Sequence, residues 1–216
     1  MDEDRPDTPV PALRRGFSLP SLLAPLLLAA TAHAGDLSAI DDWWYQLQGP
    51  GGTPYDVAAL AAGGHELVIL DSSKDGSAEG EFTPEEIDAI RAGGPDTLVI
   101  AYMSIGEASD FRFYWDELST NWAHVLASKN PKFPESRKVR YWDDDWKQFI
   151  LGHELPGALG TGYLERIVEA GFDGVYLDII DAYEFFGPKS AGGNGENPNA
   201  ARDMIDFVDE IASFFA

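Results

Sequence analysis

Short apolar runs and longer amphipathic stretches alternate along most of the chain. Five runs rich in β-branched or aromatic residues have the length of strands: residues 43–48, 66–71, 97–104, 138–142 and 173–178. Strands that are separated by helical stretches pair in parallel, because a right-handed crossover is needed to bring the chain back. The pattern therefore predicts an α/β fold with a parallel sheet built from five strand–helix units.

Local sequence signals mark the helices. Thr83-Pro84-Glu85-Glu86 has the pattern of a capping box with proline at the first helical position, and Gly93-Gly94 predicts the end of that helix. The stretch 162–170 is amphipathic, and a final helix is predicted at about 199–215. Residues 187–199 are rich in Gly, Asn and Pro, which predicts a long loop before that final helix.

Polar residues follow the carboxyl end of every predicted strand. They are Gln46, Gln48, Asp71, Ser104, Glu107, Tyr141, Asp143, Asp178 and Asp181. In a barrel all these ends converge on one rim, where active sites are built. An open doubly wound sheet is the alternative, but it needs functional side chains only near its switch point, and no glycine-rich phosphate motif follows the first strand. We therefore expect a (β/α) fold of the TIM-barrel type with about five of the eight βα units.

The first 34 residues have the layout of a secretory signal peptide. The basic pair Arg14-Arg15 precedes the apolar run 17–32, and a small-residue triplet at 32–34 predicts cleavage near Ala34. The apolar run is short for a membrane span and contains prolines, although an uncleaved anchor is the alternative. The arginine pair is also compatible with twin-arginine export. Residues 1–34 are thus predicted as a signal peptide and 35–216 as one partial-barrel domain, secreted, periplasmic or at the cell surface, without stable membrane insertion after cleavage.

The charge of the chain restricts its partners. Fifteen Lys and Arg stand against 37 Asp and Glu, which gives a net charge of −22. Such a field repels nucleic acid and anionic membranes and would attract a polycationic ligand such as a polymer of amino sugars. Simple solvation of an acidic surface explains the same composition, and net charge alone does not select a ligand.

Metal and thiol chemistry have little support. The chain has no Cys, which excludes disulfides, thiolate metal sites and cysteine nucleophiles. Its four His, at positions 33, 65, 124 and 153, show no close ligand spacing. The acidic triplet 143–145 could suggest a cation site, but it is better placed to cap the helix that follows. We expect no metal and no other cofactor.

Asp178 is the main candidate for a catalytic group. Tyr176 and Asp178 share one face of the strand 173–178, so if Tyr176 points into the barrel, Asp178 does so one step nearer to the rim. A partly desolvated carboxylate at that place suits a glycosidase nucleophile or acid. A structural aspartate that caps the following turn is the alternative.

Two further carboxylates are predicted near the same rim. Asp71 ends its strand and has the parity of Leu67 and Ile69, so it should face the rim. Glu107 follows a bend at Gly106 and could be a second catalytic carboxyl. It could equally form a structural pair with Arg112 or Arg140.

Aromatic side chains gather near the predicted strand ends. Flat aromatic faces stack on the apolar faces of sugar rings, although core packing explains most aromatic residues in most proteins. The residues that we assign to substrate binding, on this ground and on the resemblance described next, are Gln48, Tyr102, Arg140, Tyr141, Trp142, Tyr176, Asp181 and Tyr183.

Several blocks of the chain, in order, resemble one enzyme family. They lie at 45–48, 67–72, 101–108 (AYMSIGEA), 111–115, 139–142 and 171–183 (GFDGVYLDIIDAY). The set is similar to the TIM-barrel glycoside hydrolases of the endo-α-1,4-polygalactosaminidase family, family 114. The resemblance implies hydrolysis of galactosamine-containing α-1,4 polysaccharides without a metal or organic cofactor. It also implies that the family's catalytic aspartate on strand five corresponds to Asp178.

The chain departs from the family pattern in one respect. The second catalytic carboxyl of the family is a glutamate on a later strand, and no counterpart is found before Ala216. A barrel of this type takes ~250 residues, so we expect a truncated barrel, with self-association as one way to cover its open sheet edges. The predicted function is a glycoside hydrolase-like protein, an endo-acting O-glycosyl hydrolase if active. The alternatives are a non-catalytic carbohydrate-binding remnant and an inactive fragment.

Overall fold

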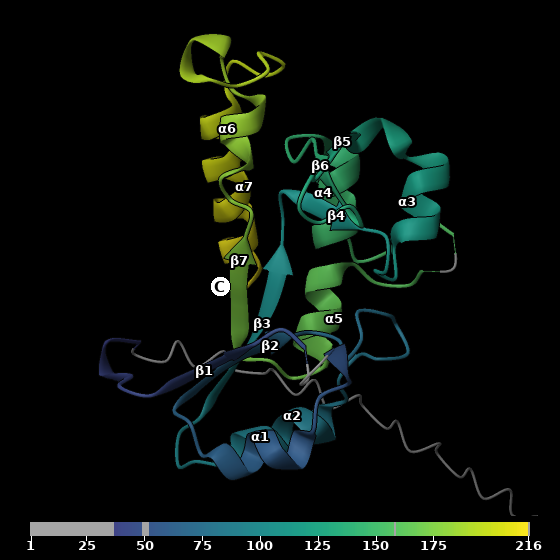
Figure 1. Ribbon diagram of the computed structural model, residues 1–216. Coiled ribbons are helices and arrows are strands. Elements are labelled where there is room, and N and C mark those ends of the chain that lie inside the picture. The colour runs from purple at the N-terminus through teal and green to yellow at the C-terminus, as the bar shows by residue number, and fades with distance from the viewer. Residues whose placement is uncertain (1–36, 49–51, 158, 216) are drawn as a thin grey trace, which may run out of the picture. The chain divides into compact units, whose positions relative to one another are not determined.

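Four parallel strands form the sheet that positions the predicted site (Figure 1). In spatial order they are β1 (Trp43–Gln46), β2 (Leu67–Asp71), β3 (Leu98–Ser104) and β7 (Gly174–Asp178). Every neighbouring pair is parallel, which confirms the predicted α/β sheet for four of its five runs. The structure is a computed structural model that describes residues 37–48, 52–157 and 159–215, so the predicted signal peptide lies outside the described residues.

The prediction of a barrel strand at 138–142 is wrong. β6 (Ser136–Val139) lies instead in a separate antiparallel sheet, between β4 (Glu107–Ser109) and β5 (Leu126–Lys129). Only residues 130–135 connect β5 to β6. A connection this short allows antiparallel pairing, whereas parallel strands need a crossover of a dozen or more residues. Asp178 therefore ends the fourth strand of the parallel sheet and not the fifth.

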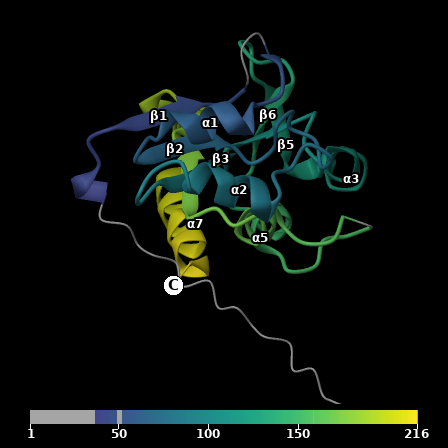
Figure 2. The same cartoon turned by 90° about the horizontal axis from the view of Figure 1, so that it is seen from below.

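Seven helices complete the described part of the chain. Their bounds are α1 (Val57–Gly63), α2 (Pro84–Arg91), α3 (Trp115–Asn121), α4 (Asp144–Leu151), α5 (Tyr163–Glu169), α6 (Ala182–Phe186) and α7 (Ala200–Phe214). Short 3-10 turns lie at Leu37–Ala39, Ala123–Val125 and Lys189–Ala191. Helices α1 and α2 lie side by side along the sheet (Figure 2). None of the described helices is long and apolar enough to cross a lipid bilayer.

The helix starts follow the sequence signals. Thr83 caps α2 by accepting a hydrogen bond from the backbone N–H of Glu86, and the Glu86 carboxylate accepts one from Thr83 in return. Asp143 caps α4 by accepting from the backbone N–H of Asp145 at 3.0 Å. Both caps satisfy N–H groups that have no partner inside the helix. The predicted capping box and the predicted cap of the acidic triplet are confirmed.

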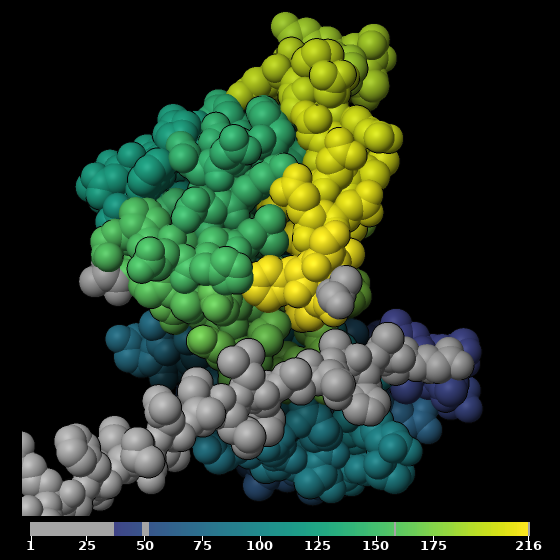
Figure 3. All heavy atoms as spheres, turned by 180° about the vertical axis from the view of Figure 1, so that it is seen from behind, coloured from purple at the N-terminus to yellow at the C-terminus, as the bar shows by residue number. Residues whose placement is uncertain are grey.

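The last helix closes the core on one side. Met204, Phe207 and Ile211 of α7 are buried, as the apolar face of the sequence predicts. Lys147 on α4 pairs with Glu210 on α7 at 2.5 Å, and its ammonium lies over the Phe207 ring. Figure 3 shows α7 lying along the part of the molecule to which α4 and α5 belong.

One face of the parallel sheet is only partly covered. Val99, Ala101 and Met103 of β3 have no exposed surface, whereas the alternate residues face the other side of the sheet. On that other side, Tyr45 of β1 is 42% exposed and Tyr176 of β7 is 45% exposed. Within the described residues, β1 and β7 each pair with a strand on one side only. The sheet is therefore open, and the barrel is not closed by the described strands.

Candidate active site

A cleft lies at the carboxyl ends of β2, β3 and β7, with a volume of about 460 Å³. Five of the predicted catalytic and binding residues line it: Gln48, Asp71, Tyr102, Glu107 and Asp178. Strand register explains this meeting, because Asp71 lies beside Tyr102 and Asp178 beside Ser104. The parallel sheet therefore brings Asp71 and Asp178 to one cleft, and β4, which follows β3 directly, brings Glu107 to the same cleft.

Two hydrogen bonds fix the half-buried carboxylate of Asp178. Tyr102 donates its hydroxyl to Oδ2 at 2.5 Å, and the backbone N–H of Ile179 donates to Oδ1 at 2.8 Å. Burial raises the pKa of Tyr102, and the hydrogen bond to the Asp178 carboxylate raises it further. Tyr102 thus stays protonated at neutral pH and keeps donating to Asp178.

The backbone after Asp178 has an unusual conformation. Ile179 has a φ of 57°, in the left-handed region that costs a non-glycine residue about 1–2 kcal/mol. Its carbonyl oxygen lies only 2.2 Å from the position that a Cβ on Gly106 would occupy. Gly106 is therefore required by close approach of the two backbones. Strain of this kind persists only where the surroundings impose it, and here it lies next to Asp178, whose carboxylate accepts from the Ile179 backbone and lines the cleft.

Asp71 forms a bidentate ion pair with Arg112 in the cleft wall. Arg112 Nη1 lies 2.7 Å from Asp71 Oδ1, and Nη2 lies 2.5 Å from Oδ2. The two side chains are only 10% and 8% exposed. The guanidinium also lies 5.6 Å from the ring centroid of Tyr163, whose pKa burial raises to about 12. The sequence suggested Arg112 only as a partner of Glu107, whereas the structure pairs Arg112 with Asp71.

Glu107 is almost fully buried and has other partners than those considered from the sequence. Lys138 Nζ lies 3.0 Å from Oε1, and the Asn130 amide donates to both carboxylate oxygens. The expectation that Glu107 pairs with Arg112 or Arg140 is therefore wrong, because Glu107 pairs with Lys138. The physical reason is the antiparallel pairing of β4 with β6, which places Glu107 directly beside Lys138.

Arg140 and the aromatic pair that follows it lie away from the cleft. The Arg140 guanidinium pairs with Glu196 and donates to the backbone carbonyl of Leu126. Tyr141 is fully buried and donates its hydroxyl to the carbonyl of Ala200 at 2.7 Å. Trp142 packs on the Tyr141 ring and on a core phenylalanine. The structure gives these three predicted binding residues structural contacts and does not bring them to the cleft.

The three remaining predicted binding residues also lie outside the cleft lining. Tyr176 lies next to the cleft, because its ring stacks beside that of the cleft residue Tyr102, with ring centroids 6.5 Å apart. Tyr183 lines another cavity, between α6 and α7. Asp181 is exposed at the start of α6 and makes no capping hydrogen bond there.

The cleft also contains residues that the sequence reasoning missed. Phe111 and Phe133 line it and are 44% and 57% exposed. Glu135 lines it as well, and its carboxylate has no ion pair or hydrogen bond within the described part of the chain. Phe133 and Glu135 lie in the loop between β5 and β6, where the sequence has no hydrophobic periodicity that would predict a functional role for them. Phe111 belongs to a block that resembles the family, which was the one available signal.

One group of side chains has the composition of a cation site. His124 Nε2 lies 2.9 Å from Asp145 and 3.8 Å from Asp143, and one ligand atom of each lies within 4.8 Å of the others. The acidic triplet alone suggested a cation site from the sequence, but His124 was not part of that suggestion because it lies far from the triplet along the chain. Helix capping by Asp143 and the ion pair of Asp145 with His124 account for the arrangement. None of the three residues lines the cleft.

Parallel strands whose carboxyl ends carry acidic and aromatic side chains around one cleft are typical of an α/β protein of the barrel type with its site at those ends. The chain matches the family model of glycoside-hydrolase family GH114 over residues 26–216. It belongs to that family, and it is a glycoside hydrolase-like protein. The resemblance found in the sequence is confirmed.

The chain is also similar to proteins of three organisms. An uncharacterized protein of Thermotoga maritima is 38% identical over 175 residues, which covers 81% of this chain and 48% of that protein. One of Methanocaldococcus jannaschii is 36% identical over 80% of this chain and 44% of its own length, and one of Deinococcus radiodurans is 32% identical over 82% and 50%. The chain thus spans about half the length of the curated relatives it matches.

A solved structure shares the fold. The crystal structure of Aspergillus fumigatus Ega3 in complex with galactosamine superposes with a TM-score of 0.52 and 19% sequence identity. The match covers 81% of this chain and 55% of that chain. The predicted fold class, α/β of the TIM-barrel type, is therefore confirmed, although the described strands do not close a barrel.

Proposed function

We propose that the protein hydrolyses an α-1,4-linked polysaccharide that contains galactosamine, with Asp178 as the reacting carboxylate. Membership of family GH114 supports a glycosidic substrate. The galactosamine bound to Ega3, a protein of the same fold, supports an amino sugar. The family resemblance supports the α-1,4 linkage and endo-acting cleavage.

The charge of the cleft is the observation that carries the proposal. Five carboxylates line it: Asp71, Asp75, Glu107, Glu135 and Asp178. Two cationic side chains line it, Lys74 and Arg112, and both are already paired with carboxylates. A cleft with this excess of negative charge attracts a substrate that carries protonated amines. The exposed rings of Phe111 and Phe133 supply flat apolar surfaces for sugar rings.

The geometry around Asp178 suits an acceptor. Both of its oxygens already accept a hydrogen bond, from Tyr102 and from the backbone of Ile179. Such a carboxylate is oriented to attack the anomeric carbon or to take a proton from water, rather than to donate a proton. We assign Asp178 the role of nucleophile or base, with Tyr102 as the residue that positions it.

Asp71 and Glu107 have a different environment. Each forms an ion pair with a cationic side chain, and a carboxylic acid proton would have to displace that contact. We assign both to shaping the cleft and its charge, so the general acid must be another carboxyl. This same observation favours the second candidate function, a carbohydrate-binding protein without turnover.

Release of reducing ends from polygalactosamine tests the proposal. We expect the purified protein to release them and the Asp178→Asn variant to retain substrate binding while losing at least about a hundredfold in rate. Asp96→Asn is the matched control, because Asp96 is exposed and precedes β3 at the end opposite the cleft. Equal rates for the parent and Asp178→Asn would reject Asp178. Binding without any reducing-end release by the parent would establish the carbohydrate-binding alternative.

We further propose that the protein is exported, on the sequence pattern of residues 1–34. Expression in a secreting host, followed by N-terminal sequencing of the extracellular product, tests this. We expect the mature chain to begin at Gly35. Retention of Met1 in a membrane-bound product would support the uncleaved anchor instead.

A further inference from the structure

A second cavity, of about 720 Å³, lies between the end of α3, one face of α4 and the loop that follows α4. It shares none of its described lining residues with the cleft. Phe149, which lines this cavity, packs on Tyr114, which lines the cleft, with ring centroids 6.2 Å apart. Core aromatic rings therefore separate the two cavities.

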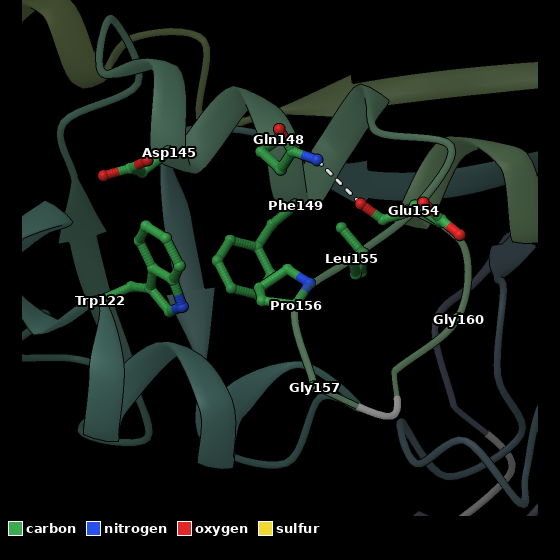
Figure 4. A pocket seen from close by; sticks show the side chains of 9 residues that line it. All are labelled: Trp122, Asp145, Gln148, Phe149, Glu154, Leu155, Pro156, Gly157 and Gly160. Atoms are coloured by element: carbon green, nitrogen blue, oxygen red, sulfur yellow. Dashed lines mark hydrogen bonds between the residues drawn. The ribbon is translucent and has the colours of Figure 1, made fainter.

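An apolar strip forms the wall of this second cavity. Figure 4 shows Trp122, Phe149, Leu155 and Pro156 next to one another along it. The Trp122 ring meets Phe149 edge to face, with centroids 6.3 Å apart, and its indole N–H donates to Glu117 at 3.3 Å. Because the protein itself satisfies the indole N–H, the half-buried ring offers its apolar surface to a ligand.

Carboxylates flank the strip. Asp145 and Glu154 lie at its two ends (Figure 4), and none of the nine described lining residues is Lys or Arg. The Glu154 side chain is exposed and makes no ion pair within the described chain, whereas Asp145 pairs with exposed His124. Gln148 donates from Nε2 to the carbonyl of Glu154 at 2.8 Å, which leaves its amide oxygen as an acceptor. The charge and shape complement a small organic cation with a flat apolar face.

We propose that this cavity binds one cationic amino-sugar unit of a polysaccharide as a non-catalytic site. The sugar ring stacks on Trp122, its ammonium group is attracted by Asp145 at that end of the strip, Glu154 adds to the negative charge of the cavity at the other end, and a hydroxyl donates to Gln148. An indole face also favours a nearby cation directly. The site holds the polymer on the protein while the cleft cleaves it elsewhere along the chain. The choice of an amino-sugar polymer as ligand rests on the proposed function.

Binding measurements on the Asp178→Asn protein, which leaves the polymer intact, test this site. The probes are an α-1,4-linked galactosamine oligosaccharide and its N-acetylated counterpart, titrated by calorimetry. We expect two binding sites for the first probe, and loss of about tenfold or more in affinity at one of them in Trp122→Ala. Trp43→Ala is the matched control, because Trp43 is 60% exposed and lines neither cavity. Phe111→Ala should weaken the other site.

A nearly isosteric double variant guards against a folding defect. Asp145→Asn with Glu154→Gln removes both charges and little volume, and it should weaken the cationic oligosaccharide but not the N-acetylated one. Unchanged binding in both Trp122→Ala and the double variant would overturn the proposal, as would equal weakening of the two probes by the double variant. Reducing-end release by the parent together with unchanged binding in these variants would overturn this inference alone. Binding at the second site without reducing-end release by the parent would overturn the proposed function alone.

Discussion

Replacing Asp71 by Asn should destabilise the protein strongly. The change removes the charge that compensates Arg112, although it keeps the size of the side chain. Arg112 is 8% exposed, and its only carboxylate partner among the described residues is Asp71, at 2.5 and 2.7 Å. Breaking a buried ion pair by removing one partner costs about 3–5 kcal/mol, because the remaining charge is left uncompensated. A typical domain has only about 5–15 kcal/mol of stability in total.

The large loss of stability expected for Asp71→Asn follows from the burial of its ion pair, so a solvent-exposed ion pair supplies the control. Arg202 and Asp206 on α7 lie 3.2 Å apart with side chains 74% and 50% exposed. An exposed pair contributes about 0–1 kcal/mol, so Asp206→Asn should have little effect on unfolding. The double variant Asp71→Leu with Arg112→Met should recover part of the loss, since apolar residues of similar volume often replace a buried pair at little cost.

Urea denaturation followed by circular dichroism measures the effect. We expect a lower midpoint for Asp71→Asn with an unchanged slope, and a fall in melting temperature of roughly 6–20 °C for a domain of this size. A loss below about 1 kcal/mol, equal to that of Asp206→Asn, would refute the reasoning that the Asp71–Arg112 pair is shielded from water. A double variant no more stable than Asp71→Asn would show that the cleft wall needs these charges.

Three further outcomes are expected. Gly106→Ala should lower activity and stability, because the new Cβ would lie 2.2 Å from the carbonyl oxygen of Ile179. Gly174→Ala is the control and should be tolerated, because the nearest atom to its Cβ would lie at 3.4 Å. Equal activity in the two variants would contradict this prediction. Burial raises the pKa of Tyr163 to about 12, so the native state keeps a proton that the unfolded chain releases near pH 10. The contribution of Tyr163 to stability is complete below pH 10 and is lost as the pH rises toward 12. In the Tyr163→Phe variant the loss of stability at alkaline pH should therefore be smaller. If the urea midpoints of this variant depend on pH in the same way as those of the parent, Tyr163 does not cause the loss. Finally, KM for a polycationic substrate should rise steeply between low and physiological salt while kcat changes little, as initial-rate assays can show, and a salt-independent KM would argue against electrostatic attraction by the cleft.

Local chemistry explains the elements that the sequence predicted correctly. The capping box at Thr83 and Glu86 depends on residues three apart, so the pattern alone identifies it. The same holds for the apolar face of α7, where Met204, Phe207 and Ile211 recur at helical spacing. Asp71 and Asp178 could be placed at one edge because parallel strands aligned by buried alternation end on the same side of a sheet.

Long-range packing explains what the sequence did not predict. The run that contains Lys138 looked like a strand of the main sheet, but the short connection from β5 led it into antiparallel pairing and placed Lys138 beside Glu107. That pairing took Tyr141 into the core rather than to the cleft. The loop that presents Phe133 and Glu135 carries no periodic signal, so only its place beside the cleft shows its relevance.

The sequence by itself determined the family, the parallel α/β class, the helix caps and the position of Asp178 at a strand end. These features depend on neighbouring residues or on short repeating patterns, which can be recognised directly in the amino-acid sequence. Only the tertiary structure decided which charges meet. Arg112 pairs with Asp71, Lys138 with Glu107, and Trp122 lines one cavity together with Asp145 and Glu154. The reason is physical: an ion pair or a cavity wall forms between side chains far apart in sequence, and backbone pairing and packing fix those distances.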